Sequence, residues 1–349
     1  MNGAEINDFT VWDHPVTTIK LLLSTFARDN WGARIIAAVP DAKLSLVTSE
    51  DAFSGTEPCD ADIAFMTREV TGRSSKNADS PELAAFQNVL RRAPRLQWLH
   101  IHPAGAERPI YVELRRRGVK VTTSSGATAS TVAQSAAGAL LGLARRFPAL
   151  MDAQRRHAWE PLLGEKAPRD LQGQTAVIVG LGPIGRTLAA MLKVLGMSVV
   201  GVRREATPVP PCDETVTYNR LFEVLPRADW LVLACPLSPV TRGLGSAAAL
   251  ARLPAGAHLI NVSRGDVAIE ADVIDALANG RLAGAYLDVF EHEPLDSASP
   301  LWDMPNVIIS PHTASHSQSL NENVFGIFLE NLAHWRKGQK LRNDVDDMS

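Results

Sequence analysis

A glycine-rich turn constrains the fold of this chain more than any other feature. Gly180-Leu181-Gly182-Pro183-Ile184-Gly185 directly follows a strand predicted over Ala176–Val179 and opens a helix predicted over Ile184–Leu195. In that context the first glycine permits a tight turn, the second lets the backbone approach a pyrophosphate, and the third lets helix meet strand. The helix N-terminus adds free N–H groups and partial positive charge. We therefore expect a dinucleotide site here; a glycine-rich turn without a ligand is the less favoured alternative.

A regular strand–helix repeat surrounds this turn. The predicted strands are Ala176–Val179, Ser198–Val202, Trp230–Ala234, His258–Val262, Gly284–Leu287 and Val307–Ile309. Six parallel strands with helices between them describe a doubly wound sheet of the Rossmann type.

The whole chain has 349 residues, a length that suits two domains. Strands and helices also alternate in its first third. Its predicted strands are Thr18–Leu23, Asp62–Met66, Leu96–His102 and Val119–Thr123, with a helix over Pro109–Arg117. A long helix over Ala129–Arg146 leads into the second domain, and an amphipathic helix over Asn321–Lys337 is expected to return to the first. We thus predict a dinucleotide-binding domain at 126–316, inserted into a substrate domain at 1–125 and 317–349.

Composition excludes several classes of protein. With 35 Lys plus Arg against 38 Asp plus Glu, the chain is not a strongly basic nucleic-acid binder. The apolar run Ala136–Ala144 is too short to cross a bilayer, and Met1–Asp13 lacks the apolar segment of a signal peptide. Cys59, Cys212 and Cys235 are too widely spaced for a disulfide framework or a zinc site. We expect a cytoplasmic protein without a metal, a membrane or a nucleic-acid partner.

The residues after the strand Ser198–Val202 bear on the cofactor. An NAD site usually has an acidic residue there to hold the ribose diol, whereas this chain has Arg203-Arg204-Glu205. Two guanidinium groups suit a 2′-phosphate, which favours NADP(H) over NAD(H). An ordinary solvated arginine pair, with Glu205 left for the ribose, stays open.

Three further side chains follow strand ends at the edge where such sheets bind ligands. Arg264 could bind the carboxylate of a 2-keto acid with its planar fork of donors. His312 could donate a proton to the carbonyl oxygen as hydride reaches the carbon, and Glu293 could orient its imidazole. Singly, each residue fits a structural role equally well, as an ion-pair partner, a loop acid or a core histidine. Together they favour hydride transfer to a small 2-keto acid.

These motifs resemble the D-isomer-specific 2-hydroxyacid dehydrogenases. Asn261–Gly265, Asp288–Leu295 and Ser310–Ala314 match family motifs in the family's order, within a resemblance that runs from Thr131 to His316. The resemblance implies Arg264 as carboxylate anchor, Glu293 as partner of the histidine, and His312 as acid and base. The residues expected at the cofactor are Gly180, Gly182, Pro183, Ile184, Gly185, Arg203, Arg204, Cys235, Pro236, Val262, Ser263 and Asp288.

The resemblance carries further implications. Asp288 would contact the nicotinamide carboxamide, and Ala104 and Gly105 would bind the substrate, Gly105 through its backbone N–H. The inserted domain would build a homodimer, and the surrounding domain would be flavodoxin-like. Gln134 departs from the family pattern, which commonly has Glu. The arginines, Glu291–Leu295 and Ser299–Trp302 are most similar to the glyoxylate/hydroxypyruvate reductases.

The expected function is NAD(P)H-dependent reduction of a 2-keto acid, such as glyoxylate or hydroxypyruvate, to the D-2-hydroxy acid. A nucleotide-sensing binding protein or co-repressor on the same fold is the alternative. A methyltransferase with a similar glycine turn would leave the three strand-end residues unexplained. Among neighbouring residues, His292 is expected to face solvent and Trp302 to pack under its loop.

Overall fold

The computed structural model describes residues 18–53, 58–72, 79–106 and 108–347. The segment Met1–Asp13 and Glu107 of the predicted substrate loop lie outside these ranges. The chain divides into two compact units, one of residues 1–127 with 318–349 and one of residues 128–317. We call them unit 1 and unit 2. One parallel α/β unit is inserted in another, as the sequence predicts.

Unit 1 contains a parallel sheet of five strands in the order β2-β1-β3-β4-β5. The strands are β1 (Ile19–Leu23), β2 (Leu44–Thr48), β3 (Ile63–Met66), β4 (Trp98–Ile101) and β5 (Lys120–Thr123). The helices are α1 (Thr25–Ala37), α2 (Ser49–Phe53), α3 (Arg68–Thr71), α4 (Pro81–Arg91), α5 (Pro109–Arg116) and α12 (Leu320–Arg336), with a 3₁₀ turn at Val345–Asp347. This strand order is flavodoxin-like, as predicted. The strand β2 was not predicted; it is a half-buried edge strand.

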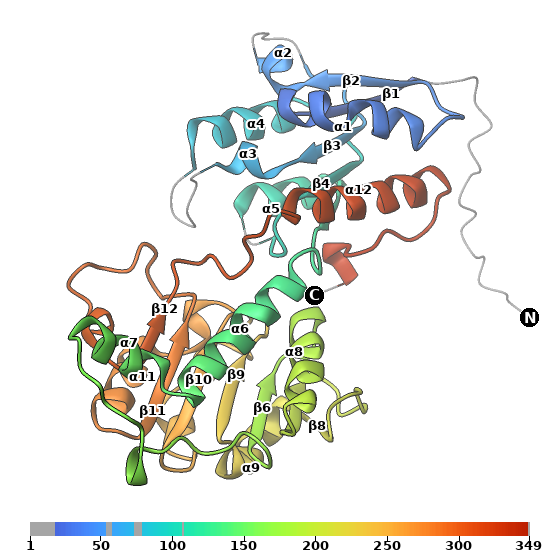
Figure 1. Ribbon diagram of the computed structural model, residues 1–349. Coiled ribbons are helices and arrows are strands. Elements are labelled where there is room, and N and C mark those ends of the chain that lie inside the picture. The colour runs from blue at the N-terminus through green and yellow to red at the C-terminus, as the bar shows by residue number, and fades with distance from the viewer. Residues whose placement is uncertain (1–17, 54–57, 73–78, 107, 348–349) are drawn as a thin grey trace, which may run out of the picture. The chain divides into compact units, whose positions relative to one another are not determined.

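The last helix packs on the first sheet of the chain. In α12, Phe325 stacks on Trp31 of α1 at 4.9 Å between ring centroids, and Phe328 stacks on Phe65 of β3 at 4.2 Å. Aromatic pairs at such distances stabilise beyond the area they bury. The predicted return of the helix over Asn321–Lys337 to the first domain is therefore confirmed, and α12 lies in unit 1 (Figure 1).

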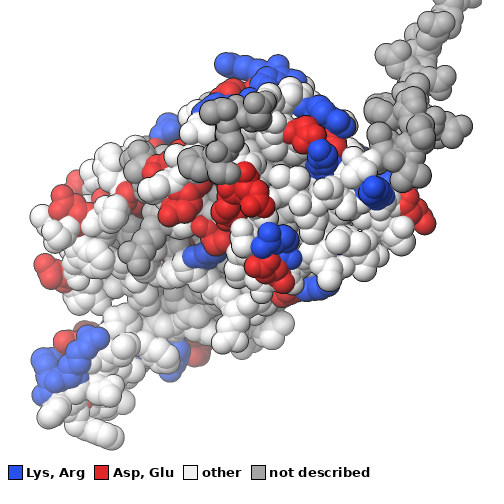
Figure 2. Space-filling view, turned by 90° about the horizontal axis from the view of Figure 1, so that it is seen from above, with Lys and Arg blue, Asp and Glu red and all other residues white. Residues whose placement is uncertain are grey.

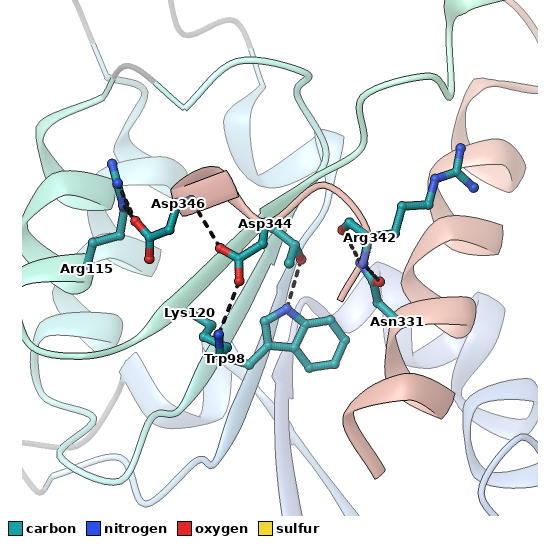
Figure 3. A network of polar contacts seen from close by, with 8 residues as sticks. Trp98, Arg115, Lys120, Asn331, Arg342, Asp344 and Asp346 are labelled. Carbon is teal, nitrogen blue, oxygen red and sulfur yellow. Dashed lines mark hydrogen bonds and ion pairs between the residues drawn. The ribbon is translucent and has the colours of Figure 1, made fainter. Parts of the chain in front are cut away.

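The chain after α12 covers the edge of this sheet (Figure 3). The Asn331 side chain bonds both the N–H and the carbonyl of Arg342, at 2.7 and 2.9 Å. The N–H of Thr123 in β5 donates to the Asn343 carbonyl at 3.1 Å. Ion pairs Lys120–Asp344 and Arg115–Asp346 add to this contact. An edge strand that would otherwise offer unpaired backbone groups is thereby paired.

A histidine lies fully buried in unit 1, with both ring nitrogens bonded. Thr122 Oγ1 accepts from Trp98 Nε1 at 2.8 Å and lies 2.7 Å from His100 Nδ1. His100 Nε2 lies 3.0 Å from Ser124 Oγ, which in turn donates to the Ile101 carbonyl. These contacts form a complete chain for a neutral imidazole that donates from Nε2. Burial accordingly lowers the pKa of His100 from 6.5 to about 3.

Stability should therefore fall in acid. Between pH 6.5 and about 3 the unfolded chain protonates this histidine and the folded chain does not, so unfolding takes up a proton. We expect the free energy of unfolding to decline by up to about 1.4 kcal/mol per pH unit through this window from His100 alone. Urea unfolding at several pH values would measure it. His100→Asn should flatten the decline; an equal slope in that variant would contradict this origin.

Unit 2 contains a parallel sheet of seven strands in the order β12-β11-β10-β9-β6-β7-β8. The strands are β6 (Thr175–Val179), β7 (Ser198–Arg203), β8 (Glu214–Thr217), β9 (Trp230–Leu233), β10 (Ala257–Asn261), β11 (Leu282–Leu287) and β12 (Val307–Ile309). The order is that of a Rossmann fold with one added strand. The prediction of six strands was wrong because β8 is short, begins with an acidic residue and lies at the sheet edge, so it has no apolar run.

Helices cover both faces of this sheet, and buried apolar clusters lie on each side. They are α6 (Ala129–Ala144), α7 (Phe147–Arg155), α8 (Pro183–Val194), α9 (Leu221–Val224), α10 (Ala247–Leu250) and α11 (Glu270–Ala278), with 3₁₀ turns at Gly164–Lys166, Tyr218–Arg220, Leu225–Arg227, Gly265–Val267 and Pro300–Asp303. The helix predicted over Ala129–Arg146 ends at Ala144, because Arg146 adopts a left-handed φ of 55°. The helix α7 then follows; the sequence analysis missed it.

The molecular surface mixes charges of both signs. On the face drawn in Figure 2, basic and acidic side chains are interspersed. Ion pairs such as Arg34–Glu322 and Arg91–Glu113 join them. Within the described ranges, no helix has the length and apolar character needed to cross a membrane.

Candidate functional site

The three glycines of the turn after β6 meet different surroundings. Gly180 has φ +102°, and a Cβ there would lie 2.6 Å from the Ala234 carbonyl oxygen. A Cβ at Gly185 would lie 1.9 Å from the Gly180 carbonyl oxygen, so α8 can approach the turn only with glycine at this position. A Cβ at Gly182 would meet nothing within 4 Å. Packing thus requires Gly180 and Gly185, whereas Gly182 borders open space.

That open space lies at the N-terminus of α8. Gly182 is the N-cap and Pro183 occupies the first helical position, which suits proline because its missing N–H has no partner there. Ile184 packs beside the buried cluster under the helix. N–H groups and the positive end of the helix dipole face a cradle without side-chain atoms, which fits a pyrophosphate.

The end of β7 carries positive charge. Arg203 is the last residue of the strand and is half-buried, while Arg204 and Glu205 after it are exposed. The strand therefore ends in a basic residue and not in the acidic residue of a typical NAD site. The arrangement offers guanidinium groups where the ribose of a dinucleotide lies in this fold.

The ends of β9 and β10 are closed by local hydrogen bonds. Cys235 is buried, and burial raises the pKa of its thiol to about 12, so it stays neutral. The carbonyl of Pro236 accepts from Thr241 Oγ1 at 2.7 Å. After the buried Val262, Ser263 Oγ donates to Asn261 Oδ1 at 2.8 Å. These hydrogen bonds fix the loops that follow β9 and β10.

Asn261 also fixes the turn that presents Arg264. Its amide accepts from the N–H of Ser263 at 3.1 Å and donates to the Arg264 carbonyl at 3.1 Å. This role was missed; the signal was a polar asparagine within the apolar strand predicted over His258–Val262, where a buried amide must find partners.

Glu293 and His312 meet, as the sequence analysis predicted. Glu293 Oε2 lies 2.8 Å from His312 Nδ1, and Glu293 Oε1 accepts from the N–H of Phe290 at 3.2 Å. A carboxylate only accepts, so Nδ1–H is the donor. The proton on Nδ1 leaves Nε2 as the nitrogen that can exchange a proton with a ligand. The His312 side chain is 42% exposed, so it is accessible from solvent.

Arg264 comes from an adjoining segment. A Cβ at Gly265 would lie 1.9 Å from the Phe290 carbonyl carbon, so the backbone next to Arg264 touches the segment that leads to Glu293. The half-buried Arg264 donates from Nη1 to the Ser263 carbonyl at 2.8 Å. Cation, carboxylate and imidazole thus follow strands β10, β11 and β12, which are neighbours in the sheet.

Asp288 makes contacts within the protein, and its expected contact with the nicotinamide carboxamide stays a prediction. Its buried carboxylate accepts from the N–H groups of Thr313 and Ala314, at 2.9 and 3.0 Å. These contacts hold the turn that carries His312. Nearby, His292 is exposed, as expected, and Trp302 donates to the Asp296 carbonyl at 2.8 Å while staying half-exposed.

The remaining candidates belong to other elements. Ala104 and Gly105 follow β4 in unit 1, the former exposed and the latter half-buried. Their contact with a substrate stays a prediction. Gln134 is exposed on α6 and donates to Ser130 Oγ at 3.2 Å. Among the described residues, no group of three or more His, Cys, Asp or Glu side chains could hold a metal ion.

Comparisons with known proteins agree with this geometry. Residues 137–314 match the family model of the D-isomer specific 2-hydroxyacid dehydrogenase NAD binding domain. A glyoxylate reductase of Korarchaeum cryptofilum is 32% identical over 268 residues, which span 74% of this chain and 78% of that protein. The human glyoxylate reductase/hydroxypyruvate reductase is 30% identical over 237 residues, 67% of this chain and 72% of that one.

Solved structures extend the likeness to nearly the whole chain. An NADPH-dependent glyoxylate/hydroxypyruvate reductase of Sinorhizobium meliloti, in complex with NADP and sulfate, superposes with a TM-score of 0.74 at 27% identity. The match covers 95% of this chain and 99% of that one. A D-isomer specific 2-hydroxyacid dehydrogenase of Xanthobacter autotrophicus, with NADPH and MES, gives 0.74 at 28% identity, with 95% and 99% covered.

Proposed function

Because the chain belongs to the D-isomer specific 2-hydroxyacid dehydrogenase family, we propose that it transfers a hydride between a nicotinamide cofactor and a small 2-keto acid. The observation that carries this proposal is the 2.8 Å pair of His312 Nδ1 and Glu293 Oε2 at the strand edge that also holds the glycine cradle. Relatives named as glyoxylate and hydroxypyruvate reductases favour those two substrates.

The residues divide the chemistry among them. A bound NAD(P)H supplies the hydride. Arg264 binds the carboxylate of the keto acid, since a guanidinium offers two parallel donors. Protonated His312 donates from Nε2 to the carbonyl oxygen, which yields the 2-hydroxy acid, and Glu293 stabilises the imidazolium before that transfer. In the reverse direction the neutral imidazole takes the hydroxyl proton.

The direct test mixes the protein with NADPH and glyoxylate or hydroxypyruvate and follows the absorbance of the reduced nicotinamide. Consumption that yields the D-2-hydroxy acid supports the proposal. Tight NADPH binding without turnover of any short 2-keto acid would favour the alternative, a nucleotide-sensing binding protein or co-repressor.

We propose NADP(H) as the preferred cofactor, because Arg203 ends β7 where an NAD site has an acid. Arg203→Asp should therefore lower the preference for NADPH over NADH by about 10- to 100-fold, since a charged hydrogen bond is lost and a repulsive charge gained. Steady-state kcat/KM with each cofactor measures the ratio. An unchanged or higher NADPH preference would refute the assignment, and Arg220→Ala, an exposed arginine paired with Glu223, is the control.

Arg264→Lys tests the carboxylate anchor. Lysine keeps the charge but loses the fork, so the KM for the keto acid should rise about 10-fold or more while the NADPH dissociation constant stays unchanged. Initial rates at saturating NADPH give the KM. A wild-type KM would remove Arg264 from the substrate site. Ala104 and Gly105 are also proposed to bind the substrate, Gly105 through its backbone N–H.

We further propose a cytoplasmic homodimer built on unit 2. Free thiols at Cys59, Cys212 and Cys235 suit a reducing compartment. An apolar surface on α6, α7 and the segment after them supports the dimer, with Trp159 97% exposed and Leu163 71% exposed. Such large exposed apolar side chains mark interaction surfaces. Light scattering gives the mass, and a monomer at micromolar concentration would refute the dimer.

A further inference from the structure

One buried residue makes several of the contacts that hold the turn carrying His312. Asp288, 3% exposed, accepts with Oδ1 from the N–H groups of Thr313 and Ala314, and with its backbone carbonyl from the N–H of His312 at 2.8 Å. His312 has φ +50°, a left-handed conformation that side chains with a Cβ rarely adopt. The contacts to Asp288 therefore keep His312 in a backbone conformation that it would not favour alone.

Two hydroxyl groups extend this support into the core. Ser310 Oγ donates to Asp288 Oδ1, because a carboxylate can only accept. Ser310 Oγ also lies 2.8 Å from Tyr286 Oη, so the phenol donates to it. Tyr286 belongs to β11, is 4% exposed, and packs in the cluster beneath α6 and α8. Burial, with the nearby Asp288 carboxylate, raises the pKa of Tyr286, so the phenol remains a donor.

The far end of the turn is fixed as well. The Ala314 carbonyl accepts from Ser135 Oγ of α6 at 3.2 Å, and Ala314 is buried in the same cluster as Tyr286. His312 stands between the two fixed ends. Its ring must reach Oε2 of Glu293, whose other oxygen, Oε1, accepts from the Phe290 N–H. A small shift of the turn would break the 2.8 Å contact, since hydrogen bonds weaken steeply with geometry.

We propose that Tyr286, Ser310 and Asp288 form a positioning relay that holds the His312 imidazole against Glu293. The hydrogen bonds all point in one direction: Tyr286 donates to Ser310, and Ser310 donates to Asp288. The three residues act through the turn and touch no substrate in this role. The activity readout of the relay rests on the proposed function.

Three variants separate hydrogen bonding from packing. Tyr286→Phe removes one oxygen, Ser310→Ala removes the hydroxyl that joins the relay, and Ser310→Thr keeps a hydroxyl. We expect kcat to fall about 3-fold in Tyr286→Phe and about 10-fold in Ser310→Ala, and to stay within about twofold in Ser310→Thr. The KM for the keto acid and the NADPH dissociation constant should change by less than about twofold in all three.

A second readout does not depend on turnover. Histidine ¹⁵N NMR distinguishes the two imidazole tautomers, and His312→Ala assigns the signal. Wild-type His312 should carry its proton on Nδ1, whereas Ser310→Ala should mix in the Nε2–H form. If no 2-keto acid is reduced, the proposed function fails while this measurement still decides the relay.

Several results would overturn the relay. Wild-type kcat and an unchanged tautomer in both Tyr286→Phe and Ser310→Ala would refute it. A fall in kcat that Ser310→Thr shares, with the tautomer unchanged, would assign the effect to packing. For Asp288→Asn we expect a lower kcat at saturating NADPH. A weaker NADPH affinity with an intact Nδ1–H tautomer would instead show that Asp288 acts by contacting the nicotinamide carboxamide.

Discussion

Replacement of His312 by alanine is expected to lower kcat for 2-keto acid reduction about 10³-fold, the range that general acid catalysis supplies. The alkoxide that hydride addition would create has no proton donor once the imidazole is gone. The NADPH dissociation constant should stay within about twofold, because the glycine cradle and α8 do not involve His312. Single-turnover rates at saturating NADPH and keto acid would measure the chemical step.

A matched control lies in the same region. His292 is exposed and stands next to Glu293 in the sequence. His292→Ala should retain the wild-type rate within about twofold. Such a result would show that the loss of a neighbouring imidazole does not by itself lower kcat. If His312→Ala keeps wild-type turnover, the proton donor is another group. If it loses NADPH affinity, the role assigned to His312 is also wrong.

The second large effect separates two glycines of one motif. Gly185→Ala should lower the free energy of unfolding by about 3 kcal/mol or more, because its Cβ would lie 1.9 Å from the Gly180 carbonyl oxygen. Gly182→Ala meets no atom within 4 Å and has φ −69°, so its stability should change by less than about 1 kcal/mol. Urea unfolding of both variants gives the comparison.

Cofactor binding should show the opposite order in the folded proteins. The methyl group of Gly182→Ala enters the space left for the pyrophosphate, so we expect NADPH affinity to fall about 10-fold or more. Nicotinamide fluorescence on titration measures it. Wild-type affinity in Gly182→Ala would show that the cradle does not hold the phosphates, and a stable Gly185→Ala would contradict the packing argument.

Much of the site could be predicted because strand ends of a parallel sheet share one edge. Arg264, Glu293 and His312 were chosen from three separate stretches, and β10, β11 and β12 bring those stretches together. The pair of Glu293 and His312 was expected and is present. The contact between the Gly265 backbone and Phe290 was not expected, since nothing local in either segment announces it.

Two elements differ from the sequence expectation. The strand β8 is short, begins with an acidic residue and has no apolar run, and helix α6 ends early where Arg146 adopts a left-handed φ of 55°. A short acidic segment becomes a strand when β7 offers its backbone groups. The bond from the Asp288 carboxylate to the turn 25 residues later was also not predicted. Hydrogen-bond partners that lie far apart in the sequence leave no periodic pattern from which they could be predicted.

By itself, the sequence determined the two parallel sheets, the glycine cradle and the set of residues at the strand ends. These follow from local patterns: apolar runs, turn glycines and polar residues that come directly after strands. The atoms through which these residues touch depend on the tertiary structure. It shows that Nδ1 of His312 is the nitrogen that meets Glu293, and that Tyr286 and Ser310 extend the hydrogen bonds of Asp288. The reason is that such contacts require ångström-level positions of segments held together by the packed core, which no stretch of sequence specifies alone.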